Sequence, residues 1–205
     1  MTTLYLARHG QDLDNAARIL NGRRDQPLTA IGLAQAYELA QKIKVAGIRF
    51  DKVYSSPLHR AFETAKTITS TLALAPPETM ELLIERDFGM MTGLPASEIT
   101  LRCAPDLLET DSITYFLSPE GAETFPQLLE RAARLLEFLR NTYPEQTLLL
   151  VSHGDFGKML YAAFYGLAWQ EVLSSFHFGN SELLLLKEGS EPEKRQVFRA
   201  PQFNH

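Results

Sequence analysis

The sequence predicts an α/β protein, a three-layer α/β/α sandwich built on a mostly parallel central sheet. Short apolar runs alternate with longer segments of helical periodicity along the whole chain. Residues 147–152 are mostly apolar, which is typical of a parallel strand covered on both faces. No repeat or low-complexity linker interrupts the 205 residues, of which 45% are hydrophobic. A single domain over residues 1–205 is therefore expected.

The first half of the chain supplies two strands and two helices. A strand over residues 4–8 precedes a long polar loop, after which Thr29 is placed to cap a helix. The next strand covers residues 52–55, and Ser56 and Pro57 form an N-cap and N1 pair for the helix that follows. The residues expected on the buried faces of the two helices are Leu33, Ala36, Tyr37, Ala40 and Ile43, and Leu58, Phe62, Ala65, Ile68 and Leu72.

The second half continues the alternation. A third strand is expected to end near Ile84, and Thr124 to Gln127 has the pattern of a capping box at the start of a long helix. The apolar strand that follows leads to a helix over residues 156–165. Two late strands are expected over residues 181–187 and 196–199.

Composition and charge exclude several classes of protein. The formal net charge of -5 argues against general nucleic-acid binding, which needs a basic surface. The longest apolar runs, residues 148–151 and 183–186, are far too short to span a membrane, and residues 1–3 do not begin a signal peptide. The single cysteine, Cys103, fits a reducing compartment and a structural role. We therefore expect a cytoplasmic protein without nucleic-acid or membrane partners.

Cationic and imidazole side chains gather where the predicted strands end. Arg8 and His9 close the first strand, and His153 and Gly154 follow the apolar strand. The carboxyl ends of parallel strands meet at one edge of a sheet, so both histidines are expected at the edge where ligands bind. Arg60 lies in the first turn of a helix, a position that favours anions. Guanidinium groups match phosphate oxygens, and an imidazole can attack phosphorus.

A carboxylate suited to proton transfer follows the third predicted strand. Glu85 stands at that position, and Glu81 and Asp87 are the alternatives. The histidines outside any such motif, expected to be solvated or structural, are His59, His177 and His205.

These motifs resemble those of the histidine phosphatase superfamily, also called the phosphoglycerate mutase-like superfamily, over nearly the full length of the chain. The matching segments are Arg8-His9-Gly10-Gln11 with Asn15, Asn21 and Gly22, Ser55-Ser56-Pro57-Leu58-His59-Arg60-Ala61, Glu85 with Phe88-Gly89, Gly121-Ala122-Glu123-Thr124, and Ser152-His153-Gly154. The resemblance implies a phosphomonoesterase that hydrolyses small phosphorylated metabolites through a phosphohistidine intermediate.

Each group then has an expected role. Neutral His9 attacks phosphorus, and Glu85 protonates the leaving group and later accepts a proton from water. Arg8, Arg60 and a protonated His153 surround the phosphoryl oxygens. The substrate-binding residues that the resemblance implies are Gln11, Asn15, Asn21, Gly22 and Gly154. No metal and no cofactor is expected, because the cationic side chains take the electrostatic role that Mg²⁺ has in other phosphoryl-transfer enzymes.

Residues 94–119 are expected to form a small cap that decides the substrate. The mutases of the superfamily have a longer insert here, with a lysine and paired arginines that hold a carboxylate. In this chain Arg102 is the only cationic residue of the segment, and its acidic residues are Glu98, Asp106, Glu109 and Asp111. This composition favours a phosphatase over a mutase. The other departures from the family pattern are Thr92, Asp155 and Lys158.

Three alternatives stay open at this point. A metallohydrolase could use His9, Asp12, Asp14 and His153, although Arg8 and Arg60 would repel a divalent cation. A phosphate-binding module without activity would not need His9, His153 and Glu85 together. Within the enzyme class the alternative is a cofactor-dependent phosphoglycerate mutase. The sequence does not decide between a sugar phosphate, a phosphoglycerate and α-ribazole phosphate as substrate, nor whether the protein is a homodimer.

Overall fold

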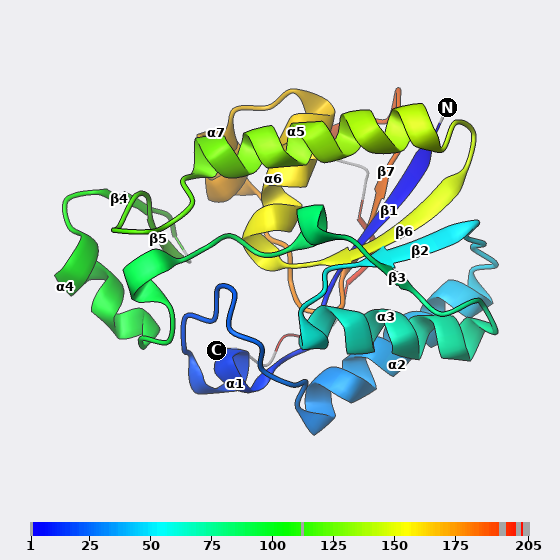
Figure 1. The fold of residues 1–205 in the computed structure, drawn as a ribbon, viewed down its shortest axis with the longest axis horizontal. Helices are drawn as coiled ribbons and strands as arrows, with labels where there is room; N and C mark the ends of the chain where they lie inside the picture. Colours follow the sequence, from blue (N-terminus) through cyan, green and yellow to red (C-terminus); the bar gives the residue numbers. More distant parts are fainter. Residues whose placement is uncertain (1, 112, 193–195, 200–201, 203–205) are drawn as a thin grey trace.

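A six-stranded sheet lies at the centre of the protein, with strand order β3-β2-β6-β1-β7-β8 (Figure 1). This computed structural model describes residues 2–111, 113–192, 196–199 and 202. The strands are β1 (Thr3–Arg8), β2 (Lys52–Ser55), β3 (Glu78–Thr79), β6 (Thr147–Ser152), β7 (Leu183–Leu186) and β8 (Gln196–Phe198). The first four run parallel to one another, whereas β7 is antiparallel to β1 and β8 to β7. The prediction of a mostly parallel sheet is confirmed.

Helices cover both faces of the sheet (Figure 1). One face packs against α2 (Ala30–Val45) and α3 (His59–Leu72), and the other against α5 (Phe125–Thr142), α6 (Gly154–Tyr165) and α7 (Trp169–Ser175). Alternate residues of the apolar strand β6 enter the two cores, because successive side chains of a strand point to opposite faces. The predicted three-layer sandwich is therefore confirmed.

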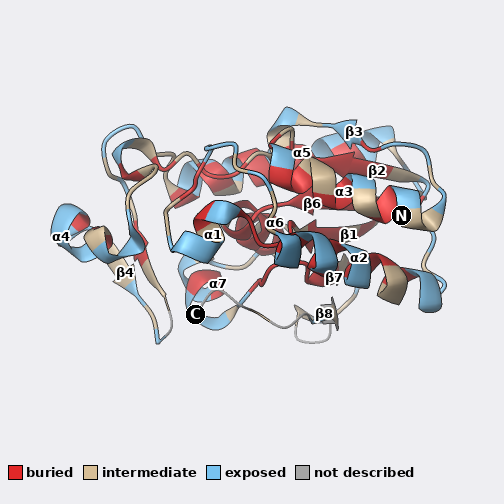
Figure 2. Cartoon of the chain, turned by 90° about the horizontal axis from the view of Figure 1, so that it is seen from below, coloured by how far each residue is buried: buried red, intermediate tan, exposed pale blue. Residues whose placement is uncertain are grey.

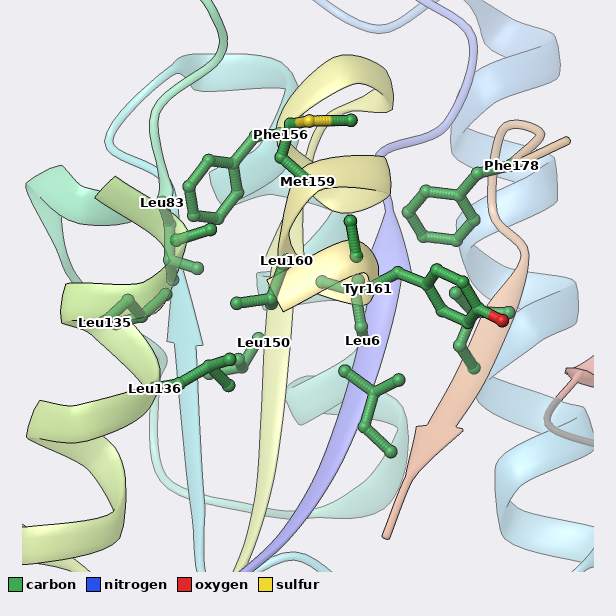
Figure 3. Packing of buried hydrophobic residues seen from close by; sticks show 14 of the residues in the cluster. Leu6, Leu83, Leu135, Leu136, Leu150, Phe156, Met159, Leu160, Tyr161 and Phe178 are labelled. Atoms are coloured by element: carbon green, nitrogen blue, oxygen red, sulfur yellow. The ribbon is translucent and has the colours of Figure 1, made fainter. Parts of the chain in front are cut away.

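The core on the α5 and α6 face is a continuous apolar layer (Figure 3). Leu135 and Leu136 of α5 lie there with Leu150 of β6 and with Phe156 and Leu160 of α6, all 2% exposed or less. Burial falls off toward the outer surfaces of the helices, which face solvent (Figure 2). The candidate catalytic residues that follow the strand ends are thus attached to strands whose side chains are tightly packed.

The segment predicted as a cap forms a small unit at one end of the sandwich (Figure 1). It contains α4 (Ile99–Cys103) and a separate antiparallel pair, β4 (Leu107–Glu109) and β5 (Thr114–Phe116). Cys103 is buried in its apolar cluster, as the structural interpretation of this residue requires.

Two predictions about helices α2 and α3 are wrong. Helix α3 begins at His59 with Leu58 as N-cap, so Ser56 and Pro57 precede the helix, and the Ser56 hydroxyl contacts His153 instead. Leu33 and Tyr37 of α2 are 47% and 55% exposed. Their helix packs through a narrow stripe that includes small residues, so the flanking positions stay in solvent.

The third strand is shorter than predicted and ends earlier. Only Glu78 and Thr79 pair with β2, and residues 81–83 form a 3₁₀ turn. Helix α6 begins at Gly154, two residues before its predicted start. The short helices α1 (Leu13–Ala17) and α7 were not predicted, because five and seven residues are too few to show a helical period. His205 lies outside the described residues.

No helix within the described ranges is long and apolar enough to cross a membrane.

Candidate functional site

The two candidate histidines meet because their strands are neighbours in parallel register. Arg8 of β1 is opposite Ser152 of β6, so His9 and His153 leave the sheet side by side. The His9 amide donates to the Ser152 carbonyl at 2.9 Å, and the two imidazole centroids are 5.1 Å apart. Both side chains are buried, at 1% and 0% exposure. The predicted convergence at one sheet edge is thus present.

Local hydrogen bonds select one tautomer of His9. Its Nδ1 lies 2.6 Å from the carbonyl oxygen of Gly10, to which only a protonated nitrogen can donate. Nε2 then carries the lone pair and accepts from Arg60 Nε at 3.2 Å. Burial lowers the pKa of His9 well below its usual value, and the charges of Arg60 and Arg8 lower it further. These contacts and the lowered pKa favour the neutral imidazole of His9, with the lone pair of Nε2 directed at Arg60.

Arg60 is fixed at this position by backbone carbonyls. Its two terminal nitrogens donate to the carbonyl oxygens of Arg24 and Gly22 at 2.6 and 2.7 Å. Arg8 donates through one terminal nitrogen to the Phe178 carbonyl at 2.7 Å. The Nε of Arg8 is buried and has no hydrogen-bond partner among the described residues. That N–H is a donor suited to a ligand oxygen.

His153 presents a second buried atom without a partner. Its Nε2 lies 2.7 Å from the Ser56 hydroxyl, whereas Nδ1 has no partner among the described residues. Burial lowers the pKa of His153 well below its usual value, with further contributions from Arg60 and His9. The protonated His153 expected from the sequence is thus not the form that this site favours by itself.

Glu85 is buried where α6 begins. Its Oε1 accepts from the amides of Arg86 and Phe156 at 2.8 and 3.0 Å, and its Oε2 accepts from the amide of Asp155 at 3.3 Å. Burial raises the pKa of Glu85, and the nearby charge of Asp155 raises it further. This setting favours the protonated carboxyl group of Glu85 up to a higher pH than usual.

The two alternative acids lie elsewhere. Glu81 is exposed on the 3₁₀ turn, and Asp87 pairs with Arg23 at 3.3 Å. Arg24 likewise pairs with Asp14, so the two loop arginines engage acids of the protein itself.

A cavity of about 400 Å³ is lined by Arg8 and Gly154 at the strand ends and by residues of the cap, whereas His9, Arg60 and His153 are not among its lining residues. The polar and charged residues that line it are Arg8, Asn21, Glu85, Arg86, Thr114, Asp155 and Lys158. The cap contributes a mainly apolar wall, which includes Ile99, Ile113, Tyr115 and Phe116.

The charged residues of the cap do not contribute to this cavity. None of the four acids of the segment lines this cavity, and Arg102 pairs with Glu98 at 2.9 Å. The cationic groups of the cavity come from other elements of the fold.

The predicted substrate-binding residues divide into two groups. Asn21 and Gly154 line the cavity. Gln11 accepts from the Thr29 hydroxyl at 2.9 Å, and Asn15 completes the capping box of α1. The carbonyl oxygen of Gly22 accepts a hydrogen bond from Arg60. The structure thus brings only the first two into the cavity.

The sequence interpretation missed two residues that hold the site together. Asp12 was considered only as a metal ligand, yet it forms a buried ion pair with Arg60. Arg86 pairs with Asp155 at 2.9 Å, and its guanidinium lies 4.3 Å from the ring centroid of Phe116. The sequence offered one indication of their role, because Asp12 and Arg86 each lie next to a motif residue.

The metallohydrolase ligand set is not assembled. Asp12 is engaged by Arg60, and Asp14 pairs with Arg24 at 2.9 Å. In the described part of the chain, no three His, Cys, Asp or Glu side chains are grouped as a metal site.

Comparisons with known proteins agree with this geometry. The model of the histidine phosphatase superfamily (branch 1) matches residues 4–196. A 2,3-bisphosphoglycerate-dependent phosphoglycerate mutase of Brucella melitensis is 32% identical over 178 residues, covering 83% of this chain and 85% of the relative. A mycobacterial glucosyl-3-phosphoglycerate phosphatase, solved with VO3, has a TM-score of 0.78 and 25% identity, covering 90% of this chain and 92% of the other. An Entamoeba histolytica phosphoserine phosphatase, solved with 3-phosphoglyceric acid, has a TM-score of 0.74 and 29% identity, covering 90% of each chain. The chain belongs to the histidine phosphatase superfamily and shares the fold of its phosphatases and mutases.

Proposed function

We propose that this protein is a phosphomonoesterase that hydrolyses small phosphorylated metabolites through a phosphohistidine on His9. The observation that carries the proposal is the pair of contacts on the His9 ring. Nδ1 donates to the Gly10 carbonyl while Nε2 accepts from Arg60, so the nucleophilic lone pair is held next to a guanidinium. The phosphorus that Nε2 attacks would have its oxygens within reach of that cation.

The first step transfers the phosphoryl group to the enzyme. Nε2 of His9 forms the bond to phosphorus as the bond from phosphorus to the ester oxygen breaks. Glu85 gives its proton to the departing oxygen, and its raised pKa favours the protonated form that this step needs. Arg8 Nε, Arg60 and His153 stabilise the charge on the phosphoryl oxygens, and the phosphate in turn favours protonation of His153.

The second step regenerates the enzyme. Glu85, now a carboxylate, accepts a proton from water as the water oxygen attacks phosphorus. The bond from phosphorus to Nε2 breaks, inorganic phosphate leaves and neutral His9 is restored. The reaction assigns no step to a metal ion, because arginine and imidazole groups meet the phosphoryl charge.

The phosphoenzyme is the decisive species. Rapid quenching of the wild-type protein with ³²P-labelled substrate should give an acid-labile, alkali-stable label that maps to the peptide containing His9. In His9→Ala the label should be absent and kcat should fall by several orders of magnitude, about 10³-fold or more. His59→Ala is the matched control, because His59 is exposed beside the same site and should leave both readouts unchanged. A variant His9→Ala that keeps a tenth of the activity would refute the nucleophile assignment.

A phosphoglycerate mutase is the second candidate. Two observations favour it: the 32% identity to the Brucella enzyme, and the cationic residues Arg86 and Lys158 in the cavity, which the composition of the cap did not disclose. A mutase must retain the dephosphorylated intermediate until it is rephosphorylated at the other oxygen. Hydrolysis is favoured here because Arg86 is already paired with Asp155, which leaves fewer free cations to retain it.

One assay separates the two candidates. The protein is incubated with 3-phosphoglycerate and a trace of 2,3-bisphosphoglycerate, and both inorganic phosphate and 2-phosphoglycerate are measured. A phosphatase should release phosphate faster than it isomerises the substrate. Isomerisation about tenfold faster than phosphate release, a barrier difference of about 1.4 kcal/mol, would establish the mutase instead.

A further inference from the structure

Lys158 of α6 is a buried ammonium group at the wall of the cavity. The residue is 4% exposed, its Nζ donates to the hydroxyl of Tyr115, and it lies 4.8 Å from the centroid of that ring. Among the described residues, no carboxylate is close enough to form an ion pair with it. The proposed hydrolysis of the phosphate ester gives this side chain no role.

The acids nearest to Lys158 are engaged with other groups. Asp155, one helical turn before it, pairs with Arg86 Nε at 2.9 Å. Glu85 accepts three backbone N–H groups. Burial lowers the pKa of Lys158 to about 8, and the charge of Arg8 lowers it as well, while the charges of Asp155 and Glu85 offset these effects only in part. A buried cation without an ion pair is costly, so its retention beside a cavity points to a ligand that contacts it with a negative charge.

We infer that Lys158 and the Tyr115 hydroxyl form a subsite for a carboxylate on the leaving group, so that the preferred substrates are small carboxylated phosphomonoesters. This inference rests on the proposed function, and it concerns which esters are hydrolysed.

The donors available match a carboxylate better than a second phosphate. An ammonium and a hydroxyl offer one donor to each of two oxygens, and one positive charge balances one negative charge. A phosphate dianion would place a second negative charge near Asp155 and Glu85. The cap wall is mainly apolar at Ile99, Ile113 and Phe116, which favours a small ester over a sugar with many hydroxyl groups.

The test compares two substrates that differ only in the carboxylate. 3-Phosphoglycerate and glycerol 3-phosphate both release a primary alkoxide, so any effect of Lys158 on Glu85 is common to both and cancels in the ratio of their kcat/KM values. The wild-type protein should prefer the carboxylated ester. Lys158→Met should reduce this preference by about 10- to 100-fold, the size expected for a charged hydrogen bond.

Three further variants make the result specific. Lys158→Arg keeps the cation and should retain most of the preference. Tyr115→Phe removes only the hydroxyl and should reduce the preference by about 3- to 10-fold, which tests the subsite even where Lys158→Met does not fold. Lys66→Met is the control, since Lys66 is a surface lysine on α3 and should leave the ratio unchanged.

The possible outcomes are distinguishable. An unchanged ratio in both Lys158→Met and Tyr115→Phe would overturn the subsite, while hydrolysis of p-nitrophenyl phosphate through labelled His9 would leave the proposed function intact. Absence of any turnover or phosphoenzyme in the wild-type protein would refute the proposed function itself. The last comparison uses fructose 1,6-bisphosphate and fructose 6-phosphate, which differ by one phosphate. If Lys158→Met changes only the ratio of kcat/KM values for this pair, the subsite binds phosphate and the carboxylate assignment is wrong.

Discussion

Asp12 and Arg60 form an ion pair in which neither side chain is exposed, with 3.3 Å between Oδ2 and Nε. The same oxygen of Asp12 accepts from Asn21 at 2.8 Å, and the other accepts from the amide of Asn15 at 2.6 Å. Because Arg60 also contacts His9, the carboxylate of Asp12 orients the cation that faces the proposed nucleophile. The loop after β1, which contains Asp12, thus holds Arg60 in its position beside His9.

Removal of this carboxylate should cost both stability and activity. Asp12→Ala leaves Arg60 buried without its partner, so the free energy of unfolding should fall by about 3–5 kcal/mol, measured by urea denaturation. kcat/KM should fall by about tenfold or more as Arg60 loses its orientation. Glu38→Ala, which breaks a surface pair with Lys42, should cost less than about 1 kcal/mol. Equal losses in the two variants would show that Asp12 has no such role.

The dependence on the leaving group tests Glu85 as the acid. Glu85→Gln cannot donate a proton, so kcat should fall by about 10²- to 10⁴-fold for alkyl phosphates. The loss should be much smaller for p-nitrophenyl phosphate, because its phenolate needs little protonation. Asp87→Asn should show neither effect, since Asp87 pairs with Arg23 outside the cavity. A uniform loss across all substrates would assign Glu85 to positioning rather than proton transfer.

The pKa shifts predict the pH window of kcat/KM. The lowered pKa of His9 keeps it neutral and nucleophilic at pH values below 6.5, and activity should fall only when the pH drops through that lowered value. The raised pKa of Glu85 keeps it protonated up to a higher pH than usual, and activity should fall as the pH rises through that value. In Glu85→Gln the alkaline limb should disappear. If kcat/KM of Glu85→Gln still decreased at high pH, this decrease would be due to the titration of another group.

Catalysis should need no added metal. Arg8 and Arg60 already place positive charge where the phosphoryl oxygens are expected, so exhaustive EDTA treatment followed by buffer exchange should leave kcat unchanged. Loss of activity that one divalent ion restores would return the metallohydrolase to first place.

The contact between α2 and the His9 loop should tolerate no side chain. A Cβ at Gly32 would lie 2.0 Å from the Gln11 carbonyl oxygen, so Gly32→Ala should destabilise the protein by about 1–3 kcal/mol and reduce kcat. Gly47 has φ +67° and no neighbour within 4 Å of a Cβ, so Gly47→Ala should cost about 1 kcal/mol through backbone strain and leave kcat unchanged. If Gly32→Ala and Gly47→Ala changed kcat equally, a steric effect of a Gly32 side chain on the His9 loop would be excluded.

Local patterns were sufficient to predict the layers of the fold and the edge where His9 and His153 meet. The apolar run of β6, the Thr29 cap and the capping box at Thr124 each depend on residues close together in the sequence. The start of α3 and the extent of β3 could not be predicted in this way. Ser56 contacts His153, a residue 97 positions away in the sequence, and the chain leaves the sheet after only two residues of β3 have paired.

The sequence by itself determined the sandwich, the family and the residue types at the ends of the strands, because hydrophobic period and motif spacing are local properties. Only the tertiary structure decided which charges are paired. It placed Asp12 against Arg60, kept the acids of the cap out of the cavity lining and, among the described residues, left Lys158 there without an ion pair. Net charge per segment cannot reveal this, since the free energy of a buried charge depends on the groups within a few ångströms, and folding brings those together from distant parts of the chain.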